Sequence, residues 1–184
     1  MKIKGSAIIS SIDYIKIHFG EEGKKEVFAR LPEEEQKIVN QPVLSSMWYP
    51  LSIFINLNQF TDSIFGKGDL ELVRIMGAFG AEHDLKTIYK IFYKIGSIQF
   101  ILKRASQVFS TYYNQGQMQV LESSSDWGII ELSDFPDITE VYLQRVSGWM
   151  EKTIELSGGQ YPKVVTIRKL KDGKSVVEFK ATWT

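Results

Sequence analysis

The sequence has no cysteine and only two histidines, His18 and His83, among its 184 residues. Without cysteine, disulfide bonds, thiolate catalysis and cysteine-ligated zinc are all excluded. Two histidines far apart in the sequence do not make a zinc site either, so we expect no metal ligands. Runs of acidic residues such as Glu33–Glu35 are more typical of a solvated first helical turn.

The chain also lacks an excess of charge of either sign. Lysine plus arginine and aspartate plus glutamate both number 22, so the formal net charge is zero. A nucleic-acid-binding protein needs a basic face for phosphate contacts, so we expect no nucleic-acid partner. A protein without net charge repels its own copies weakly, and together with the apolar helices this favours a homodimer. We expect the 50–113 region to supply its interface.

No long apolar run occurs, and no catalytic motif is present. Asp13, Lys16 and His18 interrupt the N-terminal stretch, and no segment reaches the roughly 18 apolar residues of a spanning helix. We therefore expect no membrane span and a cytoplasmic protein. The sequence has no Gly-x-Ser-x-Gly, Walker-type loop or Gly-x-Gly-x-x-Gly motif. We expect no catalytic residues, no enzyme activity and no cofactor.

Apolar residues recur at helical spacing through the first part of the chain. The pattern predicts helices over 5–20, 21–31, 32–41, 50–66, 68–80, 84–96 and 96–116, with Gly20 as the stop of the first. The stripe in the last of these segments is continuous: Ile98, Ile101, Leu102, Ala105, Val108, Phe109 and Tyr112. Residues 1–115 should therefore form a mainly helical part.

After Gly116 the apolar period changes from 3.6 to 2. Two strands are predicted at 117–122 and 127–133, then a helix over 137–159 with Asp137 as its N-cap. Gly148 within this helix suggests close approach to a sheet or a partner. A strand over 161–170, a turn at Asp172-Gly173 and an alternating last strand follow.

Residues 116–184 thus supply a sheet and a long helix. The chain as a whole, 1–184, is predicted to be a single α+β domain. Its N-terminal helical bundle precedes β-β-α-β-β with a four-stranded antiparallel sheet.

This order of elements resembles the superfamily that joins haem NO-binding domains, Bet3-type subunits of the TRAPP vesicle-tethering particle and 4-vinyl reductase-like domains. The resemblance is strongest in three segments: "ASQVFSTYYNQGQMQVLE", "VSGWMEKTIELSGG" and "KVVTIRKLKDGKSVVEFKATW". They look like a helix entering the first strand, a helix with an internal glycine, and a closing hairpin with a terminal Trp. Members include gas sensors, acyl-chain binders and aromatic-effector sensors, and the chain is most similar to a member family of unknown function.

The resemblance raises the question of haem. Haem-binding members carry a Tyr-x-Ser-x-Arg motif that holds the propionates, and this sequence has none. His83 is the one histidine near the apolar helices, but it precedes Asp84, a good N-cap for a following helix. We interpret His83 as a surface residue at a helix start, and His18 as a surface residue at a helix end.

Aromatic side chains are the remaining candidate site. They either fill the core or line a cavity between the bundle and the sheet, where relatives hold their ligands. The predicted ligand pocket consists of Phe54, Phe60, Phe79, Tyr89, Phe92, Phe109 and Tyr113. We place Trp149 in the packed core, facing Phe179 and Trp183.

Two functions remain open at this stage. The first is a non-catalytic small-molecule-binding or sensory domain, which takes an apolar or aromatic molecule and changes what it touches. The alternative is a ligand-free protein–protein interaction or assembly module like the tethering-particle subunits, with a protein partner.

Overall fold

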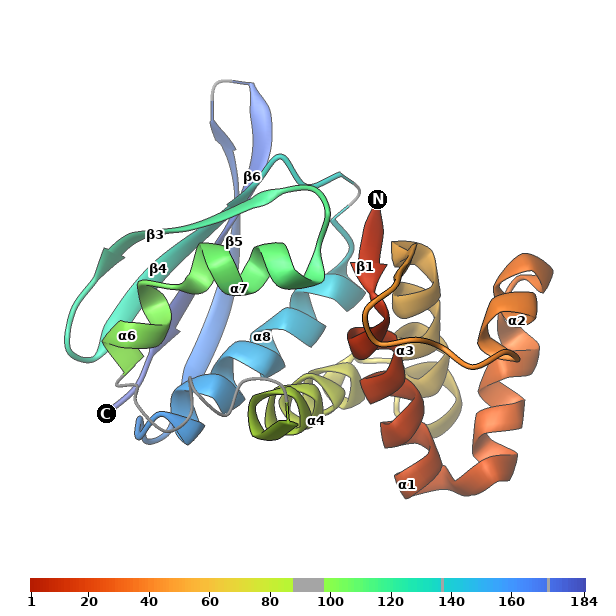
Figure 1. Cartoon of the computed structure of the whole chain (residues 1–184). Coiled ribbons are helices and arrows are strands. Elements are labelled where there is room, and N and C mark those ends of the chain that lie inside the picture. The colour runs from red at the N-terminus through yellow and green to blue at the C-terminus, as the bar shows by residue number, and fades with distance from the viewer. Residues whose placement is uncertain (88–97, 137, 172) are drawn as a thin grey trace.

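The computed structural model describes residues 1–184 except 88–97, 137 and 172, and side chains are described outside 84–97. The N-terminal part is helical (Figure 1). It contains β1 (Lys2–Lys4), α1 (Gly5–Arg30), α2 (Glu33–Val39), β2 (Trp48–Pro50), α3 (Leu51–Phe65), α4 (Glu71–Thr87), α6 (Ile98–Leu102) and α7 (Ala105–Tyr112). The rest contains β3 (Gln117–Ser123), β4 (Trp127–Ser133), α8 (Glu140–Leu156), β5 (Lys163–Lys171) and β6 (Lys174–Thr182).

The predicted α+β fold is confirmed. The four long strands form an antiparallel sheet in the order β3-β4-β6-β5, and α7 and α8 lie along one face of it (Figure 1). On the inner face of β6, Val177, Phe179 and Ala181 are fully buried, as predicted. The alternation is not strict, because Val176 and Glu178 on the other face are buried too. Trp183 extends this face, and its indole Nε1 donates a 2.8 Å hydrogen bond to the Ser125 carbonyl. The closing hairpin is thereby fastened to the β3–β4 turn.

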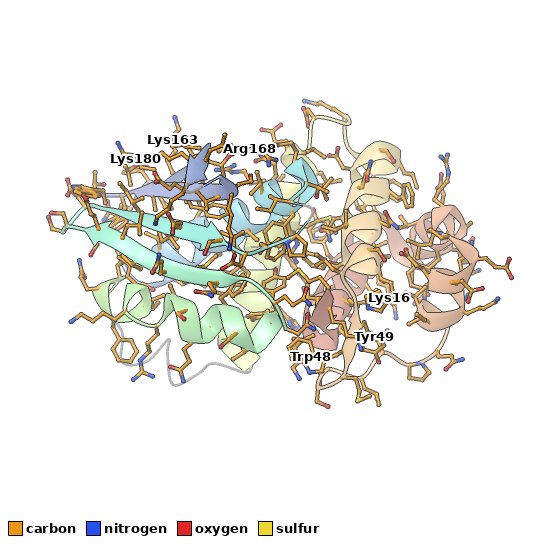
Figure 2. The ribbon with its side chains drawn as sticks, turned by 90° about the horizontal axis from the view of Figure 1, so that it is seen from above. Lys16, Trp48, Tyr49, Lys163, Arg168 and Lys180 are labelled. Carbon is orange, nitrogen blue, oxygen red and sulfur yellow. The ribbon has the colours of Figure 1, made fainter. Side chains whose placement is uncertain are left out.

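The outer face of the sheet carries paired charges. Glu131 of β4 accepts from Lys171 at 3.1 Å, and Glu178 of β6 accepts from Lys169 at 2.7 Å. Figure 2 shows Lys163, Arg168 and Lys180 at the side of the sheet away from α7. This face is therefore charged, and the apolar core lies on the helix-covered side.

Several boundaries differ from the predicted ones. At Gly20 the prediction holds, because its φ of 72° and ψ of −174° are not helical, so α1 consists of two helical segments that meet at this residue. The predicted helix 96–116 divides into α6 and α7, because Lys103 and Arg104 form a turn between them. The predicted helix 84–96 begins inside α4, and its remainder lies outside the described residues. A small antiparallel pair, β1 with β2, was not predicted.

The N-cap of α8 is Thr139 and not Asp137. The Thr139 hydroxyl accepts a 3.2 Å hydrogen bond from the Tyr142 amide, which satisfies one of the free amides of the first turn. Asp137 lies outside the described residues. At the other end, Gly158 has φ 100°, so the predicted glycine terminus is confirmed.

Helices α4 and α8 cross with their backbones in contact. A Cβ added at Gly148 would lie 2.8 Å from the Arg74 carbonyl carbon, and one at Gly77 would lie 2.9 Å from the Trp149 amide nitrogen. The close neighbour of Gly148 is therefore α4, not the sheet or a partner as the sequence suggested. Beside the crossing, Arg74 Nη2 donates to Glu151 at 2.6 Å and to the Val164 carbonyl at 2.6 Å. This links α4, α8 and β5.

Among the described helices, none combines the length and the apolar character that crossing a bilayer requires.

Candidate functional site: an apolar interior pocket

A pocket of about 110 Å³ lies between α7, α8 and the inner face of the sheet. Helices α1, α3 and α6 contribute a few further side chains to its walls. Its lining, which we call the interior pocket, consists of Ala7, Ser10, Phe54, Ile101, Leu102, Ala105, Val108, Phe109, Tyr112, Tyr113, Met118, Ile130, Tyr142, Arg145, Val146, Trp149, Met150, Thr153, Ile154 and Ala181. Most of these side chains are apolar, so the pocket favours an apolar occupant.

Two helical stripes make its main walls. On α7, Ala105, Val108, Phe109 and Tyr112 follow the spacing of three and four that puts side chains on one face. On α8, Tyr142, Val146, Trp149, Met150 and Thr153 do the same. The sequence identified both stripes as buried faces. Between the two helices, however, the stripes leave a space instead of closing on each other.

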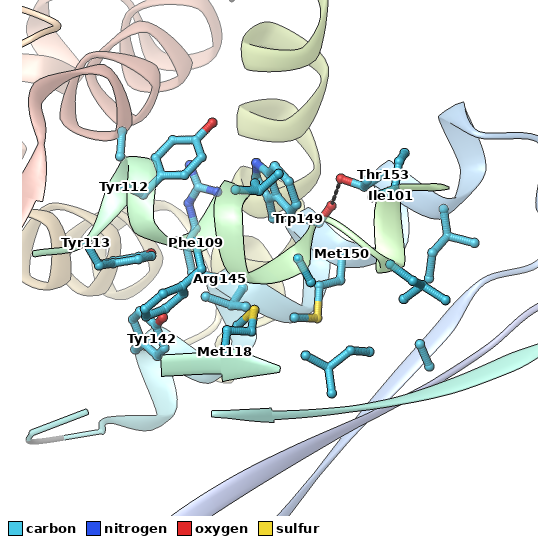
Figure 3. Close-up of a pocket in the computed structure, with 18 of the residues that line it drawn as sticks. Ile101, Phe109, Tyr112, Tyr113, Met118, Tyr142, Arg145, Trp149, Met150 and Thr153 are labelled. Carbon is cyan, nitrogen blue, oxygen red and sulfur yellow. Dashed lines mark hydrogen bonds between the residues drawn. The ribbon is translucent and has the colours of Figure 1, made fainter. Parts of the chain in front are cut away.

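One end of the pocket is aromatic (Figure 3). The Tyr113 ring lies 4.7 Å from Phe109 and 5.6 Å, edge-on, from Tyr142. Phe135 packs on Tyr142 at 4.4 Å. Edge-to-face and tilted rings at these separations attract one another, so they form a rigid end wall.

Tyr142 is fully buried, with no exposed surface. Burial raises the pKa of its hydroxyl well above the ordinary value, and the nearby Tyr113 raises it further. A side-chain hydrogen bond with Tyr113 contributes to this raised pKa. The hydroxyl is therefore a neutral group in the pocket wall that keeps its proton.

Arg145 places a buried guanidinium beside the pocket, with only 4% of the residue exposed. Its Nε donates to Asn58 Oδ1 at 3.1 Å and its Nη2 donates to Ser10 Oγ at 3.2 Å. The guanidinium also lies 5.3 Å from the centre of the Phe54 ring. Arg145 thus joins α8 to α1 and α3 at the edge of the pocket.

Sequence reasoning missed this role of Arg145. The signal was present, because Arg145 stands three residues after Tyr142 and four before Trp149, inside the apolar stripe. A long cation at a stripe position must find buried hydrogen-bond acceptors, and Asn58 and Ser10 are two polar residues on otherwise apolar helix faces. Their pairing across three helices was not visible before folding.

The predicted pocket residues divide into three groups. Phe54, Phe109 and Tyr113 line the interior pocket. Phe60 and Phe79 do not; Phe79 instead packs edge-on against Tyr14 at 5.3 Å. Tyr89 and Phe92 lie outside the described residues.

Trp149 was predicted to be packed core, and this is confirmed only in part, because the side chain packs against the core cluster but is not fully buried. The residue is partly exposed, lines the interior pocket, and its ring meets Tyr112 of α7 edge-on at 6.2 Å. The contact with Tyr112 shows that one side of the indole faces α7.

The predicted helix start at Asp84 is wrong, because α4 runs through this position to Thr87. His83 lies within α4 and is not part of the pocket lining. Its Nε2 is 3.9 Å from Asp13 Oδ2, and its ring stacks with Phe79 at 6.3 Å. His18 lies in the last turn of the first helical segment of α1, two residues before the non-helical Gly20, and its ring is 4.2 Å from the Tyr14 ring. In the part of the chain that is described, no group of three or more His, Cys, Asp or Glu residues could hold a metal ion.

Comparison with known proteins gives a result at the level of structure only. No family model matches the sequence, and no curated protein matches it. Among solved structures, the Fe(II) unliganded H-NOX protein from K. algicida is 15% identical to this chain and has a TM-score of 0.71. The match covers 98% of this chain and 96% of the H-NOX chain. An oxygen-binding H-NOX domain related to soluble guanylate cyclases, in its oxygen complex, is 13% identical over 98% and 95%, with a TM-score of 0.69.

A third similar structure comes from work on modulating haem redox potential through porphyrin distortion; it is 13% identical over 97% and 99%, with a TM-score of 0.68. These structures show that the chain has the H-NOX fold, as the resemblance to the haem NO-binding superfamily predicted. The similarity to one family of unknown function stays a prediction. Our expectation that no cofactor takes part is contradicted, because the proteins with this fold are described by their haem and Fe(II).

Proposed function

We propose that this chain is a ligand-binding sensory domain that holds a small apolar molecule in the interior pocket and performs no chemistry on it. The observation that carries the proposal is the pocket itself: an apolar space of about 110 Å³ in the core, between two helices and a sheet. Protein interiors are otherwise close-packed. The solved H-NOX structures support it, since one is an oxygen complex and its fold covers nearly the whole chain.

The size of the pocket limits the ligand. An apolar cavity of about 150 Å³ accepts a single benzene ring, so a volume of about 110 Å³ suits one ring or a short branched chain. Water is a poor occupant of such a space, because it needs several polar partners. The aromatic walls also suit a planar or compact hydrocarbon body.

Haem is bound by similar structures, so its fit to the pocket is informative. Haem iron takes His, Cys, Met or Tyr as axial ligand. Within the described lining there is no His or Cys; the ligand types present are Met118, Met150 and tyrosines. Burial keeps Tyr142 protonated, which disfavours it as a phenolate ligand. The four-pyrrole macrocycle is also far larger than the cavity, so the described residues in this arrangement do not fit a haem.

Ligand binding would reach the rest of the protein through Arg145. This side chain lines the pocket and holds Ser10 of α1 and Asn58 of α3. A ligand that displaces the guanidinium changes how α8 is attached to both helices. Such a difference between the ligand-bound and ligand-free states is what a sensory domain requires. A cytoplasmic location and a homodimer belong to the same proposal.

Thermal unfolding with toluene as probe tests pocket binding. At ten times its dissociation constant, a ligand adds about 1.4 kcal/mol, which is about 3–6 °C in a chain of this size. Ala105→Leu fills the pocket and should abolish the shift. Ala29→Leu, the same change at an exposed position of α1, should keep it.

Native mass spectrometry of freshly purified protein complements the melting experiment. It reports the mass of a co-purified occupant together with the oligomeric state. A bound haem with a sharp Soret band would contradict the small-ligand proposal, as would a toluene shift that persists in Ala105→Leu.

The alternative is a ligand-free interaction or assembly module. One observation supports it: β5 is an edge strand with exposed apolar side chains, Val165 at 44%, Ile167 at 42% and Leu170 at 81%. Exposed edge strands pair readily with another chain. Sedimentation with Ile167→Lys separates the two, since a ligand-free module would lose its self-association while ligand shifts stay absent in both proteins.

A further inference from the structure

Strand β5 forms an open edge of the sheet. It stands last in the order β3-β4-β6-β5, so no strand of the described residues lies beyond it. At Val164 the amide donates to Glu151 Oε1 at 2.8 Å, and the carbonyl accepts from Arg74 Nη2 at 2.6 Å. These two backbone groups therefore point away from β6, and the Arg74–Glu151 pair covers the start of the edge.

This cover ends after Val164. Backbone groups along an antiparallel strand point alternately to its two sides, so the amides and carbonyls of Thr166, Arg168 and Leu170 have the same direction as those of Val164. From 165 to 171, every residue except Thr166 is exposed. A row of outward backbone groups of this kind pairs readily with an added strand.

The outer face of this edge specifies which strand fits. Lys163, Val165, Ile167 and Lys169 occupy every second position of β5, and Val165 and Ile167 are 44% and 42% exposed. Side chains of an added strand lie directly beside those of its neighbour. A strand with two apolar residues between two acidic ones, at every second position, would place apolar beside apolar and carboxylate beside lysine.

The cations near this edge favour an acidic partner. Lys169 already bonds Glu178, but Lys163 and Lys180 have no ion pair within the described part of the chain. Lys180 stands opposite Val165 in the β5–β6 register, and Figure 2 shows both unpaired lysines on the side of the sheet away from α7. Carboxylates of a partner would complement this charge.

A second copy of β5 fits the edge poorly. Antiparallel pairing of two copies about Thr166 would bring Lys163 opposite Lys169, and pairing about Ile167 would bring Lys163 opposite Lys171. Like charges directly opposite one another are destabilising. The occupant should therefore come from a different protein.

We propose that β5 binds an extended acidic segment of a partner protein as an added strand, with its apolar side chains beside Val165 and Ile167 and its carboxylates beside Lys163 and Lys169. This inference goes beyond the proposed function, because it concerns the far side of the sheet and does not depend on what the interior pocket holds.

Fluorescence anisotropy with a labelled peptide tests the proposal on the full chain. The probe is the peptide SETVTITES, which has the acid–apolar–apolar–acid pattern at every second position. The peptide SKTVTITKS, with lysine in place of both glutamates, is its control. Both are titrated at low ionic strength, where exposed charges are screened least.

The wild type should bind SETVTITES and bind SKTVTITKS at least tenfold more weakly, since two carboxylate–lysine contacts become repulsive. Lys163→Glu should weaken SETVTITES about fivefold, the size of one exposed ion pair. Lys67→Glu, the same change at an exposed residue of the α3–α4 loop, should leave it unchanged. Thr166→Pro removes an edge amide that β6 does not use, which an edge strand tolerates, and should weaken SETVTITES about tenfold.

Three results would overturn the inference. Equal binding of the two peptides would mean that the lysines recognise nothing, and undiminished binding to a folded Thr166→Pro would place the peptide elsewhere. If SETVTITES does not bind the wild type, β5 is not a site for an acidic strand. Self-association of the wild type that Thr166→Pro abolishes in sedimentation would then assign the edge to a second copy. The toluene shift is independent of all these outcomes, so the proposed function stands or fails separately.

Discussion

Replacing Gly148 by alanine tests the backbone contact between α4 and α8. The new Cβ would meet the Arg74 carbonyl, with the carbonyl carbon at 2.8 Å. Backbone atoms on both sides leave no flexible side chain to move, so the helices must separate. Overpacking of this kind costs typically about 1–3 kcal/mol and sometimes more. Alanine returns about 1 kcal/mol through its better helix propensity.

The helices must separate near the Arg74–Glu151 pair, whose shortest distance is 2.6 Å, so we expect the upper part of the range. The net loss should be about 2 kcal/mol, which in a chain of this length lowers the melting temperature by about 4–8 °C. Urea unfolding followed by circular dichroism measures it.

Gly128→Ala is the matched control. A Cβ at Gly128 would lie 3.4 Å from a Leu102 methyl group, an ordinary contact with a flexible side chain. This variant should be neutral, or slightly more stable than wild type, since glycine within a strand is unfavourable. A Gly148→Ala protein as stable as Gly128→Ala would show that the two helices do not touch as described.

Trp149→Ala should lower the free energy of unfolding by less than the roughly 3–5 kcal/mol of a core tryptophan, because the ring borders an existing space. Thermal melting of this variant should also show a larger toluene shift than in wild type. A loss of about 4 kcal/mol or more would mean that Trp149 belongs to the packed core. The second prediction concerns acid: hydrogen bonds from Gln119 first, and then Lys171, lower the pKa of Glu131. A lowered folded-state pKa stabilises the protein above the unfolded value, near 4.5, and this stabilisation disappears as the pH falls through the folded value. Glu131→Gln should therefore flatten the decline in stability below about pH 4.5, as urea midpoints from pH 7 to 3 would reveal, and an unchanged decline would refute it.

The sheet half of the fold was readable because its signals are local. Alternation from Val177 to Trp183 and a glycine after Leu156 each depend on neighbours in sequence. The break between α6 and α7 was not readable, since no Gly or Pro marks Lys103 and Arg104 and the apolar stripe continues across them. Gly20 was readable, because its positive φ separates two helical segments of α1 as the glycine predicted.

The sequence predicted the residues that line the candidate site, but not the space between them. Both stripes were recognised, and Phe54, Phe109 and Tyr113 do line the space. Whether the facing stripes of α7 and α8 meet or stand apart depends on the separation of these two helices, and no local pattern in the sequence encodes it. Arg145 was overlooked for a related reason, because its partners Ser10 and Asn58 are more than eighty residues away.

The glycine crossing also determines how α8 is able to move. Helices that pack through side chains shift past one another by small rotamer changes, but here the two backbones touch and nothing between them can adjust. Sliding of α8 along α4 is therefore blocked, and the motion left to α8 is a tilt about the point of contact. Gly148 stands midway along α8, which runs from Glu140 to Leu156. A tilt that widens the pocket beside Tyr142 therefore narrows it beside Ile154, so the two ends of the pocket change width in opposite directions.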